Sequence, residues 1–195
     1  MLTAEEILDL FRRTGALLEG HFLLSSGLHS TCYLQCALVL QYPHEAEALG
    51  QALAERYGRE RIATVAAPAL GGIIIGHEVA RALGARFIWT ERENGMMTLR
   101  RGFAVQPGER VLVVEDVMTT GGSTRETMDV LRRAGAEVAA AAAIVDRSGG
   151  AIDLGVPHQA LLTLKIPTFR ADECPACLRQ EPLIKPGSRA GLQTR

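Results

Sequence analysis

Lysine and asparagine are almost missing from this chain of 195 residues. Lysine occurs only at Lys165 and Lys185, and Asn94 is the single asparagine, whereas arginine is abundant. This composition fits either a GC-rich genome or a hot habitat, and the sequence does not separate the two. The formal net charge is only −1, which argues against broad binding to nucleic acids or to anionic membranes.

Long apolar runs are also missing, so the sequence offers no membrane-spanning segment. The N-terminus, Met-Leu-Thr-Ala-Glu-Glu, lacks the basic region and apolar core of a signal peptide. A hydrophobic content of 47% is that of a globular protein, and the length suits one domain with a substantial core. We therefore expect a cytoplasmic enzyme.

Cysteine is too scarce, at four residues, for a disulfide scaffold of this length. Cys32 and Cys36 lie four apart, and Cys174 and Cys177 form a C-x-x-C motif. The four thiolates could bind zinc, although i and i+4 in a strand share a face but diverge in space. A redox pair and ordinary buried cysteines are the alternatives, and we favour the last.

Residues 111–124, Val-Leu-Val-Val-Glu-Asp-Val-Met-Thr-Thr-Gly-Gly-Ser-Thr, are the most informative part of the chain. Four consecutive apolar residues predict a strand covered on both faces, as in a parallel sheet. Glu115 and Asp116 follow at its carboxyl end, where such sheets bind ligands. The turn over residues 119–124 offers backbone N–H groups and a helix N-terminus to a phosphate. Acids beside a phosphate cradle indicate a sugar phosphate as the ligand.

An ordinary buried strand rarely ends in paired acids followed by Thr-Thr-Gly-Gly-Ser, so we favour the binding site. Two other phosphate motifs are absent, because no Gly-x-x-x-x-Gly-Lys occurs and no Gly-x-Gly-x-x-Gly follows a strand. The segment instead resembles the phosphoribosyl-diphosphate (PRPP) motif of the type I phosphoribosyltransferases.

Apolar periodicity and capping signals predict alternating helices and strands. A capping box of Thr3 and Glu6 opens a helix over residues 3–19. Residues 138–145 are nearly all alanine and favour a helix by propensity, but they follow a helix stop, so we expect a strand. Residues 91–102 are predicted to form a mobile loop or a hairpin. The other predicted strands are 21–24, 28–40, 62–67, 86–90, 111–114 and 161–166, and the other helices are 43–58, 72–83 and 122–134.

This order predicts an α/β fold with a doubly wound, mainly parallel sheet, as the resemblance to type I phosphoribosyltransferases also implies. We expect a single domain, residues 1–195, whose core is 41–164. Residues 1–40 and 165–195 do not fit the alternation, and we expect a small cap built from this N-terminal segment and the C-terminal tail.

The motif residues divide by role. We expect Glu115 and Asp116 to bind the 2′- and 3′-hydroxyls of the ribose, because transfer at the anomeric carbon depends more on holding a cationic transition state than on moving protons. Thr124 is expected either to bind the phosphate or to cap the helix that follows. The resemblance implies that the turn Ala69, Leu70, Gly71 binds diphosphate. The expected PRPP contacts that follow the acids are Val117, Met118, Thr119, Thr120, Gly121, Gly122 and Ser123.

The basic loop 91–102 can close over a diphosphate and exclude water. Clustering favours Arg100 and Arg101 as catalytic residues together with Asp116, whereas Arg92 better matches the family's loop arginine and is expected to contact PRPP. A solvated hairpin is the alternative. Mg²⁺ is implied as a cofactor carried by the diphosphate, without a protein-only ligand cluster.

Several segments also resemble the orotate phosphoribosyltransferases, which implies that orotate and PRPP give orotidine 5′-monophosphate and diphosphate on the way to UMP. Thr119, Arg147 and Ser25 are the implied orotate contacts, and arginine suits bidentate recognition of a carboxylate. Many family members carry lysine where this chain has Ser25 and Gly71, which leaves open the cations that meet the diphosphate. The resembling segments are 21–30, 33–35, 97–103, 145–147 and 185–189.

Two alternatives remain. A purine phosphoribosyltransferase would not need the carboxylate-binding Arg147. A PRPP-sensing regulator would usually need a nucleic-acid-binding face, which the composition does not show. The resemblance also implies a homodimer whose loop reaches the partner's site.

Overall fold

A six-stranded sheet with the order β5-β4-β3-β6-β7-β8 forms the centre of the computed structural model, which describes residues 2–24 and 26–185. Five strands run parallel, and β5 pairs antiparallel with β4 at one edge. The strands are β3 (Thr64–Pro68), β4 (Arg86–Glu93), β5 (Met96–Leu99), β6 (Arg110–Met118), β7 (Glu137–Asp146) and β8 (His158–Thr163).

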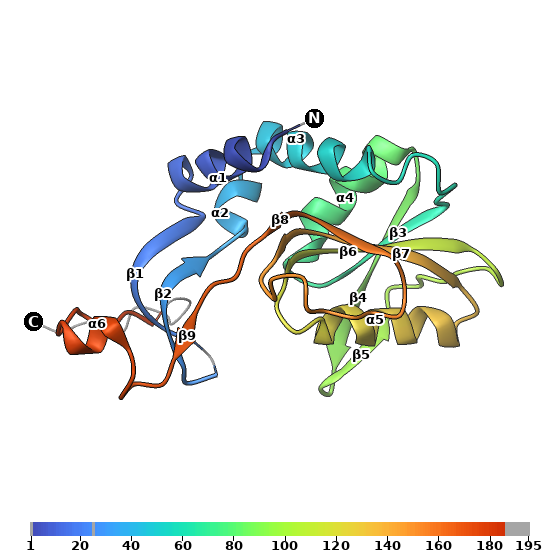
Figure 1. The fold of residues 1–195 in the computed structure, drawn as a ribbon. Coiled ribbons are helices and arrows are strands. Elements are labelled where there is room, and N and C mark those ends of the chain that lie inside the picture. The colour runs from blue at the N-terminus through green and yellow to red at the C-terminus, as the bar shows by residue number, and fades with distance from the viewer. Residues whose placement is uncertain (1, 25, 186–195) are drawn as a thin grey trace, which may run out of the picture.

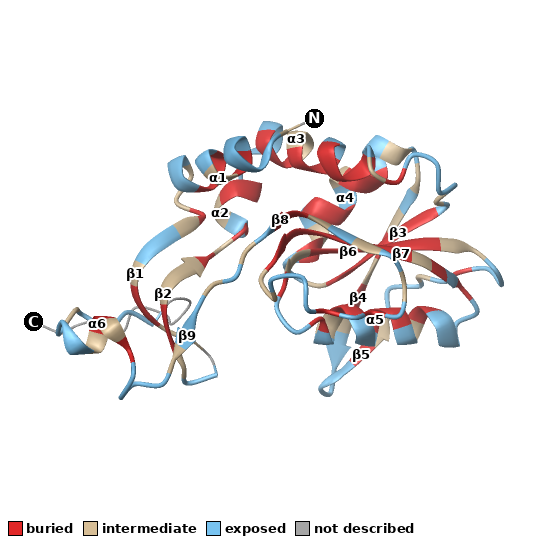
Figure 2. Cartoon of the chain, in the orientation of Figure 1, coloured by how far each residue is buried: buried red, intermediate tan, exposed pale blue. Residues whose placement is uncertain are grey.

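Helices cover both faces of this sheet (Figure 1). Residues of α1, α2, α3 and α4 build one hydrophobic core with the first face, and α5 builds a second core with the other. The buried residues of these helices lie mainly on the sides that face the sheet (Figure 2). The expected doubly wound, mainly parallel sheet is therefore confirmed. The helices are α1 (Ala4–Arg13), α2 (Ala37–Leu40), α3 (Pro43–Ala54), α4 (Gly72–Leu83) and α5 (Gly122–Arg133).

A second, smaller sheet is built from both ends of the chain. Its antiparallel strands are β1 (Leu17–Leu23), β2 (His29–Leu34) and β9 (Thr168–Phe169), in the order β1-β2-β9. The short helix α6 (Pro175–Leu178) contacts β1, and the unit lies to one side of the large sheet (Figure 1). We call residues 17–34 and 168–185 the hood. It corresponds in position along the chain to the expected cap.

Several predicted elements differ from the observed ones at their boundaries, and three of them illustrate why. The first helix ends at Arg13 rather than near residue 19, because Gly15 takes a left-handed φ of 70° and the chain then enters β1. The predicted strand 28–40 is two elements, since β2 ends at Leu34 and α2 follows, with Val39 buried in the core. The last strand of the large sheet lies at 158–163 instead of 161–166.

Two other predictions hold. The alanine-rich stretch is strand β7, which pairs with β6 on one side and β8 on the other, and these ladders outweigh the helix propensity of alanine. Residues 91–102 contain the β4–β5 hairpin, whose turn residues Asn94 and Gly95 have φ of 51° and 82°. Positive φ at both positions is typical of a type I′ turn.

The described part of the chain contains no helix that is both long enough and apolar enough to span a bilayer.

Candidate active site

The two adjacent acids lie inside β6, two residues before its end at Met118, and not after the strand as the sequence suggested. β6 continues because it pairs with β7 up to Met118, whereas its ladder with β3 stops at Val113. The acids are therefore flanked on one side by an opening between β6 and β3, which stays paired with β4 up to Pro68. This opening is at the carboxyl edge, where parallel sheets bind ligands.

Adjacent residues of a strand point to opposite faces, and the two acids accordingly meet different elements. A Cβ placed on Gly71, in the turn before α4, would lie 2.6 Å from both carboxylate oxygens of Asp116. On the other side, the Thr124 hydroxyl of α5 donates to Glu115 Oε2 at 3.5 Å. The N-cap of α5 is Gly121, so Thr124 does not cap the helix but supports the acid.

The acid pair holds a proton at neutral pH. Burial raises the pKa of Glu115 to about 9, and the nearby charge of Asp116 adds to this rise. Burial also raises the pKa of Asp116. Burial and both acids raise the pKa of the Cys36 thiol well above its ordinary value, so that this thiol stays neutral. Glu115 therefore favours its protonated form and can donate to a hydroxyl group, while the carboxyl oxygens of the pair can accept.

The turn between β6 and α5 forms a polar cavity of about 270 Å³. The first turn of α5 leaves backbone N–H groups without intrahelical acceptors, as at every helix N-terminus. Gly121 has a φ of 74°, and a Cβ there would lie 3.0 Å from Leu154, so glycine is required. Arg125 fixes the turn by donating to the Thr120 carbonyl at 2.6 Å. The lining residues are Arg92, Glu115, Val117, Met118, Thr119, Thr120, Gly121, Gly122, Ser123, Thr124 and Glu126.

The second strand-to-helix turn, Ala69-Leu70-Gly71, lies beside Asp116. Ala69 N–H donates to the Thr90 carbonyl at 2.7 Å, which ties the turn to β4. Leu70 is 84% exposed. The structure thus brings this turn and the acid pair together, although they are more than forty residues apart in sequence.

A second cavity of about 520 Å³ lies between the hood and the motif turn. Arg147 lines it from the loop after β7, where its backbone N–H donates to the Met118 carbonyl at 2.8 Å. Asp146 shapes this loop by accepting from the backbone N–H groups of Ser148 and Gly150. The lining residues are Leu23, Leu24, Ser26, Tyr33, Thr119, Thr120, Arg147, Ile166 and Thr168.

Arg147 has no partner for its charge among residues 2–24 and 26–185. Its Nε is buried without a hydrogen-bond partner, and none of the ion pairs in this part of the chain includes its guanidinium. Burial lowers the pKa of Arg147, because removing the guanidinium from water disfavours its charged form. An anionic, planar ligand in this cavity would supply the missing acceptors.

Ser25 lies outside the described residues, and so does most of the segment 185–189, but Leu24 and Ser26 line the cavity. The sequence reasoning did not select Tyr33, Ile166 or Thr168 as site residues. Tyr33 begins one of the segments that resemble orotate phosphoribosyltransferases and could have been found there. Ile166 and Thr168 carry no local signal.

The loop arginines separate into two groups. Arg92 lines the smaller cavity and pairs with Glu126 at 2.7 Å. Arg100 pairs with Glu93, and Arg101 pairs with Glu91 and lies 5.7 Å from the ring centroid of Trp89. Arg100 and Arg101 line neither of these two cavities.

A larger cavity, of about 740 Å³, lies between the β4–β5 hairpin and α5. Its lining includes Met96, Met97, Leu99 and Val130 but neither of the paired acids nor the motif hydroxyls. We place the substrate site at the two smaller cavities because the convergent polar groups lie there.

Cys174 and Cys177 do not meet the other two cysteines. Their thiols lie beside the imidazoles of His21 and His29 in the hood, within a group of four potential ligands. Cys36 is buried in the core beneath the acid pair. The four-thiolate combination is therefore wrong.

Comparisons of sequence and of structure show which known proteins this chain is similar to. The family model described as "Phosphoribosyl transferase domain" matches residues 39–154. The orotate phosphoribosyltransferase of Pelotomaculum thermopropionicum is 56% identical over 188 residues, covering 96% of this chain and 99% of the relative. That of Desulforamulus reducens is 53% identical, covering 96% and 98%. The crystal structure of orotate phosphoribosyltransferase from Aeropyrum pernix superposes with a TM-score of 0.67 and 29% identity, covering 82% of this chain and 94% of that one.

Proposed function

Because the chain belongs to the phosphoribosyl transferase family, we propose that it transfers ribose 5-phosphate from PRPP to orotate. The products are orotidine 5′-monophosphate and diphosphate, as expected in UMP synthesis. The observation that carries the choice of base is the half-buried Arg147, whose buried Nε has no partner among the described residues, in the cavity that also contains Thr119 and Thr120. Identity above 50% to orotate phosphoribosyltransferases over almost the whole chain supports it.

The ribose phosphate of PRPP binds along the motif. Glu115 and Asp116 meet the 2′- and 3′-hydroxyls: protonated Glu115 can donate a hydrogen bond to one hydroxyl, and the carboxyl oxygens of the pair can accept a hydrogen bond from the other. The 5′-phosphate lies in the cavity of about 270 Å³ at the N-terminus of α5, against residues 117–123. Two anchors, at the phosphate and at the hydroxyls, fix the anomeric carbon relative to the cavity that contains Arg147, which favours the transfer through an oxocarbenium-like transition state.

Orotate binds in the cavity of about 520 Å³ with its carboxylate on Arg147. The guanidinium can donate two parallel hydrogen bonds to a carboxylate. Thr119 lines both cavities, so it can contact orotate on one side and the phosphate turn on the other. Ser25, between two residues that line the cavity, is kept as a proposed orotate contact.

The diphosphate, which is the leaving group, binds at the turn Ala69-Leu70-Gly71. Mg²⁺ prefers oxygen ligands, keeps several waters and is usually bound by one or two carboxylates with substrate phosphates. The carboxylate of Asp116, which adjoins Gly71, fits a metal that arrives on the diphosphate. Bound there, Mg²⁺ would neutralise charge on the leaving group.

The active enzyme is a homodimer in this proposal. Arg92 is the PRPP contact from the subunit's own hairpin, and exposed Arg100 and Arg101, which line neither cavity of their own subunit, act at the partner's site. Because PRPP is a soluble phosphorylated metabolite, the enzyme works in the cytoplasm in this proposal, and residues 1–195 act as one catalytic domain. Elution of the protein as a monomer at assay concentrations, with full activity, would contradict the shared site.

The test of the reaction is a panel of bases. Purified protein is mixed with PRPP and Mg²⁺, and separately with orotate, adenine, guanine or xanthine, while base consumption is followed by ultraviolet absorbance. Consumption of orotate alone supports the proposal. Consumption of purines alone contradicts the base assignment, and PRPP binding without any reaction supports a regulator instead.

A further inference from the structure

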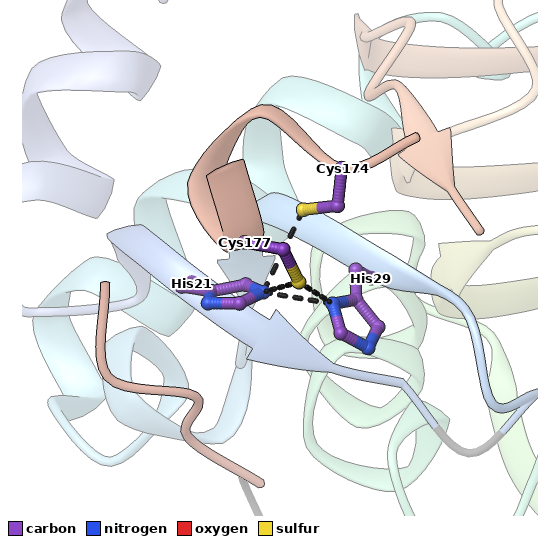
Figure 3. Close-up of side chains that lie close together, drawn as sticks. All are labelled: His21, His29, Cys174 and Cys177. Carbon is purple, nitrogen blue, oxygen red and sulfur yellow. Dashed lines mark hydrogen bonds between the residues drawn. The ribbon is translucent and has the colours of Figure 1, made fainter. Parts of the chain in front are cut away.

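Two histidines and two cysteines from distant parts of the chain meet in the hood (Figure 3). His21 belongs to β1, His29 to β2, Cys174 precedes α6, and Cys177 lies in α6. One potential ligand atom of each lies within 4.8 Å of all the others. His21, His29 and Cys174 are buried, and Cys177 is half-buried.

The spacing of these atoms is close to that of a tetrahedral zinc site. Bond lengths of about 2.0–2.1 Å to nitrogen and about 2.3 Å to sulfur place the ligand atoms about 3.3–3.8 Å apart. His21 Nε2 lies 3.6 Å from Cys174 Sγ and 3.5 Å from Cys177 Sγ. His29 Nδ1 lies 3.2 Å from Cys177 Sγ and 2.8 Å from His21 Nε2.

Hydrogen bonding alone does not satisfy this cluster. His21 Nδ1 lies 2.9 Å from the Glu181 carbonyl, which can only accept, so Nδ1 carries the proton and Nε2 has one lone pair. Without a metal, the cluster has two arrangements. If His29 Nδ1 carries a proton, this N–H and the S–H groups of Cys174 and Cys177 compete for that single lone pair; if it does not, Cys177 can donate to it, but two nitrogen lone pairs then face each other at 2.8 Å. A cation at the centre removes both conflicts, because all four ligand atoms then direct lone pairs at it. The bond from His21 Nδ1 to a carbonyl is the kind that orients a metal-binding imidazole.

The hood also needs a crosslink. Phe22, Cys174 and Ala176 are buried there, yet they belong to neither of the two hydrophobic cores found in the described residues. α6 has only four residues. A unit this small cannot bury enough apolar surface to hold itself together and usually depends on a disulfide or a metal.

We propose that His21 Nε2, His29 Nδ1, Cys174 Sγ and Cys177 Sγ bind one Zn²⁺. Zinc is the cation that favours a tetrahedral set of two nitrogens and two thiolates. Two thiolates cancel the charge of the ion, which makes its burial acceptable. All four positions are filled by protein, so the ion has a structural role and takes no part in the transfer reaction.

The ion fixes the geometry of the base cavity from outside. It joins the β1–β2 hairpin to the C-terminal segment across 153 residues of sequence, from His21 to Cys174. His29 pairs with Phe169 of β9, and the neighbouring Thr168 lines the cavity that contains Arg147. Zinc thereby holds both walls that the hood gives to this cavity.

Metal content tests the proposal. The full-length protein is produced in zinc-supplemented medium and desalted, and its metals are measured by plasma mass spectrometry. About one zinc ion per chain is expected, with at least a roughly tenfold loss in Cys177→Ser and in His29→Gln. Cys32→Ser, which removes a thiol of the hood outside the cluster, should keep its zinc. Cobalt in place of zinc should give the visible absorption of a tetrahedral thiolate site, and this absorption should disappear when zinc is added.

If a variant does not fold, the wild-type protein still decides the question. A strong chelator should remove the zinc and lower Tm, and Zn²⁺ should restore Tm whereas Mg²⁺ should not. Wild-type protein without stoichiometric zinc, a Cys174–Cys177 disulfide detected as the loss of two hydrogens by mass, or zinc retained in the Cys174→Ser/Cys177→Ser variant would each overturn the proposal. None of these measurements depends on which base the enzyme uses.

Discussion

Replacing Arg147 by alanine removes the only charge that the base cavity offers to a carboxylate among its lining residues. The guanidinium has a buried Nε without a partner, so the free enzyme already bears the desolvation cost of this cation. Orotate supplies the missing acceptors when it binds. The Arg147→Ala variant should therefore bind orotate much more weakly while its fold is unaffected.

The size of the effect follows from the bonds that are lost. Hydrogen bonds to charged groups contribute about 1.5–3 kcal/mol each, and two parallel bonds that share one desolvation cost give a loss of roughly 2–4 kcal/mol. This loss corresponds to an affinity for orotate about 30- to 900-fold weaker. The affinity for PRPP should change by less than about threefold, because its anchors lie on β6 and α5. Tm should stay equal or rise, since an unpaired buried cation has been removed.

Initial rates measured by orotate absorbance give KM for each substrate, and calorimetric titration checks that KM follows Kd. Arg170→Ala is the matched control, because Arg170 also lies in the hood but is exposed and pairs only with Asp172 at 3.4 Å. Equal increases of KM for orotate and PRPP, or a loss of kcat with unchanged orotate affinity, would refute the role given to Arg147.

Three further predictions concern the acid pair and the turn beside it. Asp116→Asn keeps the shape of the side chain but weakens the ribose contact, so kcat should fall by about 10- to 1000-fold with little change in Tm, and undiminished turnover would contradict the ribose role. The pKa of Glu115 is raised from 4.5 to about 9, so the stability contributed by its protonated form is complete below pH 4.5 and is lost as the pH rises toward 9. Glu115→Gln should remove that loss of stability. The difference in Tm between the variant and the wild type should therefore shift in favour of the variant as the pH rises from about 5 to about 9. A difference that stays constant would show that Glu115 does not titrate in this range. A Cβ on Gly71 would lie 2.6 Å from the carboxylate oxygens of Asp116, so Gly71→Ala should lower kcat/KM for PRPP by about 5- to 150-fold, whereas Gly58→Ala, whose Cβ meets nothing within 4 Å, should leave it unchanged.

The sequence was most informative where neighbouring residues act together. The acids, the hydroxyl-rich turn and the helix start are contiguous, so their shared role could be predicted before the fold was known. The order of strands and helices likewise predicted the parallel sheet, and it placed the alanine-rich strand β7 correctly against its own helix propensity. Local patterns failed at boundaries, as in the helix that was predicted to run to residue 19 and ends at Arg13.

The sequence was least informative where the partners are distant. The C-x-x-C motif suggested metal binding, but the nearest additional ligands in sequence, Cys32 and Cys36, were the wrong ones. His21 and His29 face Cys174 and Cys177 only because β1, β2 and α6 come together in the hood. Clustering also favoured Arg100 and Arg101, whereas Arg92 is the loop arginine that lines the cavity at the motif turn.

The linear chain by itself determined the kind of ligand, because a pentose phosphate is recognised by a strand end and the turn that follows it, all within fourteen consecutive residues. Tertiary structure alone decided that Gly71 lies against Asp116, that Arg147 has no counter-charge among the described residues, and that the hood closes one wall of the base cavity. The reason is physical: periodicity and capping act over a few residues, whereas burial, the loss of a charge partner and the convergence of ligands depend on which distant segments pack together.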